Sequence, residues 1–170
     1  IAPVSEPATP RSATAATKVS RTSLLAFSGV SLPLAAAGLP FVVYLPPYYA
    51  GPLGLSLSVV GVLFLIVRLL DVPLDPILGH AMDRTTSRFG RYRPWVLGSA
   101  LMMLAGIWLV FMAEPGISPV RAFAGLLVMY IGYSTLQLAQ TAWGSTLTLD
   151  YHERSRVFGW WQIANITGML

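Results

Sequence analysis

Long apolar stretches separated by short polar segments dominate this sequence. The first stretch has 26 consecutive residues without a charged side chain, which is enough for a helix to cross about 30 Å of hydrocarbon. Four prolines in this stretch predict a kinked helix with an irregular outer end. The whole pattern predicts four complete transmembrane helices and the start of a fifth, over residues 24–49, 59–82, 95–113 and 122–149 and from residue 157 onward.

The beginning of the chain has a different pattern. Residues 1–16 are rich in Ala, Pro, Ser and Thr and show no apolar period. Such a segment cannot bury enough surface to offset the entropy lost on ordering. We therefore expect residues 1–21 to form a disordered cytoplasmic tail and residues 22–170 to form a transmembrane bundle. The chain begins without methionine and ends inside an apolar stretch, so we expect it to be a fragment.

Composition excludes several function classes. Of the 170 residues, 55% are hydrophobic and 11% are charged, whereas soluble domains carry about 25% charged residues. The net charge of +4 comes from short basic clusters between apolar runs, so no nucleic-acid partner is expected. The chain has no cysteine, and its two histidines lie far apart at positions 80 and 152, which disfavours thiol chemistry and zinc sites. The expected surroundings are a lipid bilayer.

Lysine and arginine predict the orientation of the spans. Three of these residues lie in the tail, four lie between the second and third spans, and two lie between the fourth and fifth. The loops on the opposite side contain only Arg121. Because positively charged loops stay in the cytoplasm, the N-terminus is expected there.

A polar stripe interrupts the second span. Arg68, Asp71 and Asp75 follow one another at i, i+3 and i+7, so at 100° per residue they share one helix face. Ionised side chains inside a membrane are costly unless they pair or face water, and they usually mark a functional site. The two carboxylates can bind a small cation or share a proton. The alternative is that Arg68 only neutralises an aspartate between packed helices.

A dense motif follows the stripe. From Asp71 to Trp95 the sequence reads DVPLDPILGHAMDRTTSRFGRYRPW. Part of it resembles the signature loop between helices two and three of the major facilitator superfamily, and its flanks resemble the version in glycoside-pentoside-hexuronide:cation symporters of melibiose permease type. Residues 142–144 and 150–159 are similar to that family's loop after helix four. The signature-loop residues are Gly79, Asp83, Arg84, Arg88, Gly90 and Arg91.

The resemblance implies an all-α membrane protein with the major facilitator fold. Two six-helix bundles would enclose a cavity, and this chain would supply most of the N-terminal bundle without the C-terminal half. The resemblance also implies that Asp71 and Asp75 bind the coupling ion, Na⁺ or H⁺, with a hydroxyl from Ser134. The signature loop would act as a gating latch, in which Asp83 accepts hydrogen bonds from arginines and Gly79 permits close helix approach. Its arginines would also fix the orientation of the spans, because positively charged loops remain in the cytoplasm.

Polar residues in the fourth span are candidates for binding the solute. Gln137, Gln140 and Thr141 recur at helical spacing, with Trp143 nearby. Amide groups and an aromatic plane suit a neutral polyhydroxyl ligand, because they supply donors, acceptors and a stacking surface. Gln137 stands where the galactoside members of the resembled family have a carboxylate. The alternative is that these residues hydrogen-bond to neighbouring helices.

The expected function is therefore cation-coupled symport of a sugar, glycoside or related small polar solute by alternating access, in the plasma (inner) membrane. No cofactor is expected besides the coupling ion. A transporter of a lipid-like or other organic solute is one alternative, and a non-transporting membrane scaffold is another. An enzyme is not expected, because the sequence contains no Ser/His/Asp set, no metal-ligand spacing and no phosphate-binding glycine loop.

Overall fold

The computed structural model describes residues 19–88, 90–148 and 150–170, and its regular structure is entirely helical over this part of the chain. Residues 1–18 of the expected tail lie outside the described residues. Arg21, the last residue assigned to the tail, instead begins the first helix. The six helices are α1 (Arg21–Val43), α2 (Leu45–Ala50), α3 (Leu57–Arg84), α4 (Arg93–Phe111), α5 (Pro119–Thr146) and α6 (Tyr151–Met169).

Four of these helices, α1, α3, α4 and α5, are long and apolar enough to cross a membrane. They correspond to the four complete spans expected from the sequence, although each begins two or three residues earlier. Many large apolar side chains on their outer faces are exposed, including Leu65, Val72 and Leu101, as expected for surfaces that contact lipid. The structure confirms an all-α membrane fold.

Serine caps explain where three of the spans begin. Ser20, Ser56 and Ser118 precede α1, α3 and α5, and each side chain accepts a hydrogen bond from the backbone N–H three residues later. This contact satisfies one of the amide groups that a helix start leaves without a partner. The caps therefore place the helix starts slightly before the apolar runs that predict them.

The first predicted span, 24–49, is two helices in the structure. A break at Tyr44 separates α1 from α2. The physical reason is proline chemistry, because Pro46 and Pro47 have no N–H to donate to Val42 and Val43 four residues earlier. Two consecutive helical hydrogen bonds are thus lost where the sequence predicts an irregular outer end.

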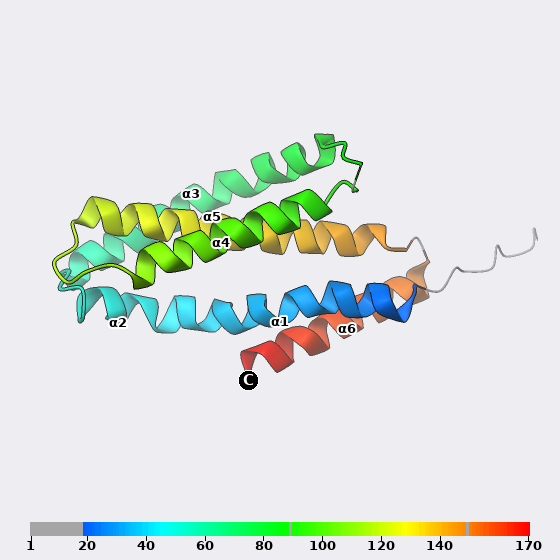
Figure 1. Ribbon diagram of the computed structural model, residues 1–170, viewed down its shortest axis with the longest axis horizontal. Helices are drawn as coiled ribbons and strands as arrows, with labels where there is room; N and C mark the ends of the chain where they lie inside the picture. The colour runs from blue at the N-terminus through cyan, green and yellow to red at the C-terminus, as the bar shows by residue number, and fades with distance from the viewer. Residues whose placement is uncertain (1–18, 89, 149) are drawn as a thin grey trace, which may run out of the picture.

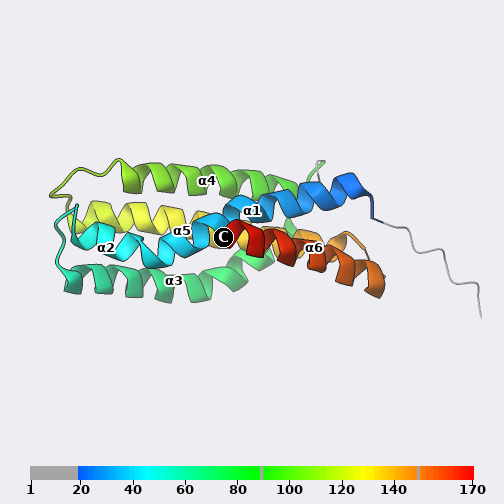
Figure 2. The same ribbon diagram turned by 90° about the horizontal axis from the view of Figure 1, so that it is seen from below.

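The helices extend along one common direction (Figure 1), and α5 occupies the centre of the bundle. It packs against α4 and α3, which lie on opposite sides of it in Figure 2. The other close pair is α1 with α6, which crosses α1 at an incline. Consecutive spans are joined by short loops, and two loops at one end are tied together by a hydrogen bond from Gly116 N–H to Leu53 O.

Glycines allow α4 and α5 to approach closely. A Cβ added to Gly106 would meet the backbone of Met129, and one added to Gly132 would meet the backbone of Met103. Transmembrane helices associate through van der Waals packing, and small residues at the interface bring their backbones together. These two contacts bring α4 directly against the central helix.

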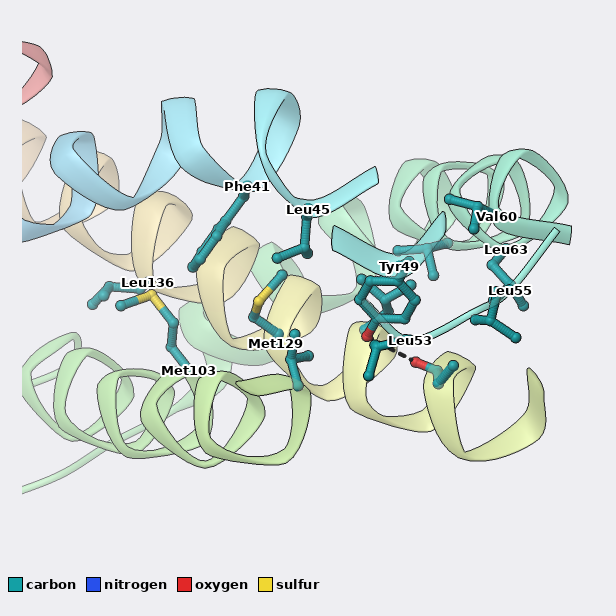
Figure 3. Close-up of a cluster of buried hydrophobic side chains, with 14 of the residues drawn as sticks. Phe41, Leu45, Tyr49, Leu53, Leu55, Val60, Leu63, Met103, Met129 and Leu136 are labelled. Atoms are coloured by element: carbon teal, nitrogen blue, oxygen red, sulfur yellow. Dashed lines mark hydrogen bonds between the residues drawn. The ribbon is translucent and has the colours of Figure 1, made fainter. Parts of the chain in front are cut away.

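The main apolar core lies between α1, α2, α3, α4 and α5. Phe41, Leu45, Met103 and Met129 contribute to it and point toward one another in Figure 3. Tyr49 is also buried there, and its hydroxyl donates a hydrogen bond to Ala122 O at 3.4 Å. The core holds α1 and α2 against α5 and thereby positions one wall of the cavity described below.

Helix α6 begins six residues before the fifth apolar stretch does. The segment from Tyr151 to Arg156, expected to be a loop, is helical. Asp150 caps it by accepting hydrogen bonds from the backbone N–H groups of His152 and Glu153. An Asp at the N-cap followed three residues later by a Glu is a sequence pattern of helix starts. Because of this cap, the segment is helical even though it is polar.

Candidate functional site

The polar stripe of the second span faces a cavity of about 630 Å³. Arg68, Asp71 and Asp75 all line this cavity from α3, as their shared helix face predicts. Asp71 lies near the midpoint of the 28-residue helix. The other walls come from α1, α5 and α6, so four helices bound the cavity.

Arg68 and Asp71 form an ion pair across one turn of α3. The Nη1 of Arg68 donates to Oδ2 of Asp71 at 3.3 Å. The arginine side chain is 71% exposed, whereas the aspartate side chain is only 15% exposed. The carboxylate is therefore largely enclosed, and its positive partner extends from the helix toward the surroundings.

Asp75 is linked to a different helix. The hydroxyl of Ser134 on α5 donates to Oδ1 of Asp75 at 2.6 Å. This short bond is charge-assisted and joins α3 to α5 directly at the cavity. The structure thus brings together Asp71, Asp75 and Ser134, the three residues that the resemblance implies for the cation.

Four further polar residues line the same cavity. Gln137 is the one predicted solute-binding residue among them, and Tyr130, Tyr133 and Asn165 were not predicted. The sequence contains a pattern that could have identified the tyrosines. Polar residues recur at helical spacing on α5, at Tyr130, Tyr133, Ser134 and Gln137. Asn165 comes from α6, and no spacing within one helix could have assigned it to this site.

The other predicted solute-binding residues lie outside this cavity. Gln140 is 1% exposed, and its Nε2 donates to Phe27 O at 2.9 Å and Ser31 Oγ at 2.6 Å on α1. Thr141 is exposed, and its hydroxyl donates to Gln137 O at 2.8 Å. For Gln140 the packing alternative holds, since its amide links α5 to α1.

Trp143 is also outside the cavity. It lies six residues after Gln137, which places it about 120° around α5. Its ring meets the edge of Phe27 with centroids 5.7 Å apart, and the guanidinium of Arg93 lies 5.9 Å from its centroid. A cation above an indole ring is attracted by the ring electrons. Trp143 therefore anchors the junction of α1, α4 and α5.

The signature loop is held by contacts that the sequence did not predict. The hydroxyl of Tyr92 donates to Asp83 Oδ1 at 3.1 Å. Trp95 Nε1 donates to Thr85 Oγ1 at 2.9 Å, and that hydroxyl in turn donates to Ala81 O. These bonds fasten the start of α4 to the end of α3.

The two glycines of the loop have different roles. Gly90 has a φ of +99°, a left-handed conformation that glycine adopts without steric cost. Gly79 was expected to permit close helix approach, but a Cβ there would meet only Leu138 Cδ2, at the ordinary distance of 3.9 Å. The close-approach prediction is wrong for Gly79, because the α3–α5 spacing at this level already leaves room for a methyl group.

The loop arginines collect at one end of the bundle. Arg84 lies in the last turn of α3, where a positive charge interacts favourably with the helix dipole. Arg88 and Arg91 line a cleft of about 570 Å³, together with Arg93 and Trp143. Arg88 and Arg91 of the predicted latch thus contribute to a basic cleft that shares no lining residue with the aspartate cavity.

Known proteins resemble this chain over most of its length. A family model described as MFS/sugar transport protein matches residues 26–170. The uncharacterized symporter YnaJ of Bacillus subtilis is 34% identical over 114 residues, which are 65% of this chain and 24% of that protein. The inner membrane symporter YicJ of Escherichia coli is 32% identical over 134 residues, 76% of this chain and 29% of that protein.

The lactose permease of Lactobacillus delbrueckii subsp. bulgaricus is 30% identical over 109 residues, which are 60% of this chain and 17% of that protein. The chain spans about a quarter of the length of the first two relatives. The family match covers the cavity, the signature loop and the four spans except for the first five residues of α1. The chain is an integral membrane protein that belongs to the MFS/sugar transport protein family, as its resemblance to the glycoside-pentoside-hexuronide:cation symporters predicts.

Proposed function

We propose that the protein is a secondary transporter that moves a sugar or glycoside together with a cation. The observation that carries this proposal is the arrangement of Asp71 and Asp75 on one face of α3, in a cavity near the middle of the span. The relatives named symporters and lactose permease support the same class of activity. This chain covers only part of the length of these relatives. The proposed transport is therefore an activity of a full-length transporter that contains this chain.

The charges of the site explain why a cation is needed. One arginine and two aspartates leave one negative charge when all three are ionised. Asp71 has Arg68 at 3.3 Å, whereas Asp75 has a neutral hydroxyl at 2.6 Å. An uncompensated carboxylate inside the membrane costs several kcal/mol by most estimates. A bound cation removes this charge, and the loaded site can then close away from water more easily than the empty one.

The oxygen atoms of Asp71, Asp75 and Ser134 can bind either candidate ion. Each aspartate engages one carboxylate oxygen in the contacts described above and keeps a second oxygen for a cation. Na⁺ would bind to oxygens of Asp71, Asp75 and Ser134, since hard cations prefer oxygen ligands. H⁺ would bind to a single carboxylate. Asp75 is the candidate, because it contacts the neutral hydroxyl of Ser134, whereas Asp71 is paired with Arg68.

The solute is proposed to bind beside the cation. Gln137, Tyr130, Tyr133 and Asn165 line the same cavity and combine amide and hydroxyl groups with aromatic rings. A neutral polyhydroxyl solute requires such a mixture of donors, acceptors and flat apolar surfaces. Solute and cation would then occupy one cavity, so the binding of each would affect the closing of the other.

The orientation proposed from the basic residues places the start of α1 in the cytoplasm. The signature loop then lies on the cytoplasmic side, where it would act as a latch. The bonds from Tyr92 to Asp83 and from Trp95 to Thr85 support this role, because they join the end of α3 to the start of α4. The inner membrane is the proposed location, in agreement with the relative YicJ.

The deciding experiment is uptake by the full-length protein in vesicles under an imposed Na⁺ or pH gradient, with a panel of sugars. Asp75→Asn is expected to reduce gradient-driven accumulation about tenfold or more, because a contact with a charged group contributes about 1.5–3 kcal/mol. Asp71→Asn should act in the same direction. Glu114→Gln, an acid-to-amide change in an exposed loop, serves as the matched control.

Two outcomes would contradict the proposal. Accumulation by both aspartate variants at the level of the Glu114→Gln control would show that these carboxylates do not couple the ion. Uptake of lysolipids in preference to every sugar would show that the transported solute is an amphiphile and not a sugar. The proposed transport mechanism would still hold. The response to Na⁺ alone or to pH alone identifies the coupling ion.

A further inference from the structure

α1 and α6 both begin at the same end of the bundle (Figure 1). A second cavity lies between them. Its volume is about 450 Å³, and it shares no residue with the aspartate cavity. Side chains from only these two helices form it. They are Arg21, Leu24, Leu25 and Ser28 from α1, with Arg156 and Trp160 from α6.

Two arginines give the cavity a positive mouth. Arg21 is exposed and forms no ion pair with any residue that the structure describes. Arg156 uses Nη1 on Glu153 at 2.9 Å and Nη2 on Val19 O at 2.8 Å. A guanidinium group has five N–H donors, so three remain on Arg156. Arg21 and Arg156 carry two positive charges, and Glu153 neutralises one of them. One positive charge and several N–H donors therefore remain to bind an anion.

The same cavity has an exposed apolar wall. Leu25 is 67% exposed and Trp160 is 49% exposed. Tryptophan is enriched at membrane interfaces, where its ring lies at the level of the headgroups. An anion dissolved in water would gain nothing from this wall, whereas a molecule that is charged at one end and apolar at the other would use both parts of the cavity.

Ser28 adds a polar group deeper in the same crevice. Its hydroxyl oxygen is buried and has no hydrogen-bond partner within the described part of the chain. Ser28 follows Arg21 by seven residues, or about 10 Å along a helix. The polar interface of each leaflet is only about 5–7 Å thick. A ligand that contacts Arg21 and also supplies an acceptor for Ser28 must therefore reach from the interface toward the hydrocarbon.

We infer that this crevice binds an anionic phospholipid. The phosphate contacts Arg21 and the free donors of Arg156, an ester oxygen lies beside Ser28, and an acyl chain runs along Leu25 and Trp160. Basic pockets between transmembrane helices have the charge that anionic headgroups require. The occupied site ties the start of α1 to the start of α6, which Val19, Glu153 and Arg156 already join.

The test uses the full-length protein purified in a neutral detergent. Binding is followed by native mass spectrometry and by the shift in unfolding temperature on addition of phosphatidylglycerol, phosphatidylcholine or inorganic phosphate. Phosphatidylglycerol is expected to bind and stabilise the protein, whereas phosphatidylcholine and inorganic phosphate should have little effect. An equal effect of inorganic phosphate would overturn the lipid assignment, and an equal effect of phosphatidylcholine would overturn the role of charge.

Variants locate the site. Arg21→Gln is expected to weaken phosphatidylglycerol binding about fivefold, the loss for one basic residue near an anionic surface, and Arg21→Lys should restore most of it. Arg121→Gln, which removes an exposed arginine from the start of α5, is the matched control and should leave binding unchanged. Equal affinities in the Arg21→Gln and Arg121→Gln proteins would disprove this location.

Ser28→Ala provides an independent check. Loss of one hydrogen bond in a membrane protein corresponds to about a threefold weaker interaction. The change removes only a hydroxyl without a partner in the described chain, so the protein without lipid should be as stable as before. Unchanged phosphatidylglycerol affinity in this variant would contradict the placement of the ester region beside Ser28.

Discussion

One methyl group added at Gly132 tests whether glycine sets the distance between α4 and α5. In Gly132→Ala the new Cβ would lie 2.5 Å from the backbone nitrogen of Met103 and 2.8 Å from its Cα. Favourable contacts between carbon atoms occur at about 3.5–4.0 Å, so the helices would have to separate locally by about 1 Å. The obstructing atoms belong to the backbone and cannot rotate away as a side chain can.

The magnitude follows from two opposing effects. Overpacking of a close contact costs about 1–3 kcal/mol, and replacing glycine by alanine inside a helix recovers about 0.5–1 kcal/mol. We expect Gly132→Ala to lower the free energy of unfolding by about 1–2 kcal/mol. Gly98→Ala is the matched control on α4, because a Cβ there meets nothing within 4 Å, and it should be neutral or slightly stabilising.

The assay is reversible unfolding of the full-length protein in mixed micelles with increasing sodium dodecyl sulfate, followed by circular dichroism. The difference between the two variants is the informative quantity, because both make the same chemical change in a transmembrane helix. Equal unfolding midpoints for Gly132→Ala and Gly98→Ala would refute the conclusion that the α4–α5 distance depends on glycine.

Four further substitutions test the site and its supports. Gln140→Leu leaves two acceptors on α1 without their donor and should destabilise the protein by about 1–3 kcal/mol in the same unfolding assay, whereas Gln137→Leu should chiefly raise the KM for the solute. Ser134→Ala removes the bond to Asp75 and should weaken cation-dependent uptake without abolishing it, as shown by a higher cation concentration for half-maximal rate. Asp150→Ala removes the cap of α6 and should lower the free energy of unfolding by about 0.5–2 kcal/mol. A Gln140→Leu protein of normal stability, a Ser134→Ala protein with unchanged cation dependence, or an unaltered unfolding midpoint for Asp150→Ala would each contradict its prediction.

Features contained within one helix could be predicted from the sequence. The shared face of Arg68, Asp71 and Asp75 follows from the helical period alone, and all three line one cavity. The four spans follow from the lengths of the apolar runs. Helix ends are less predictable, as α6 shows, because the cap at Asp150 extends the helix into a polar segment.

Features that join two helices required the structure. Gln137 and Gln140 differ by less than one turn of α5, yet Gln137 lines the cavity and Gln140 is bonded to α1. Polarity and spacing cannot distinguish them, because the position of α1 around α5 depends on the packing of the whole bundle. The same reason explains why Asn165 was not predicted. Trp143 differs, because helical spacing alone places it about 120° around α5 from Gln137.

The amino-acid sequence by itself determined that this protein crosses the membrane, which residues share a helix face and which family it resembles. These properties depend on transfer of side chains into lipid and on the fixed geometry of a single helix. Only the tertiary structure decided that Ser134 bonds to Asp75, that Tyr92 holds Asp83 and that α6 completes the cavity. Such contacts depend on how closely and at what rotation the helices pack, and that is set by many small contacts acting together.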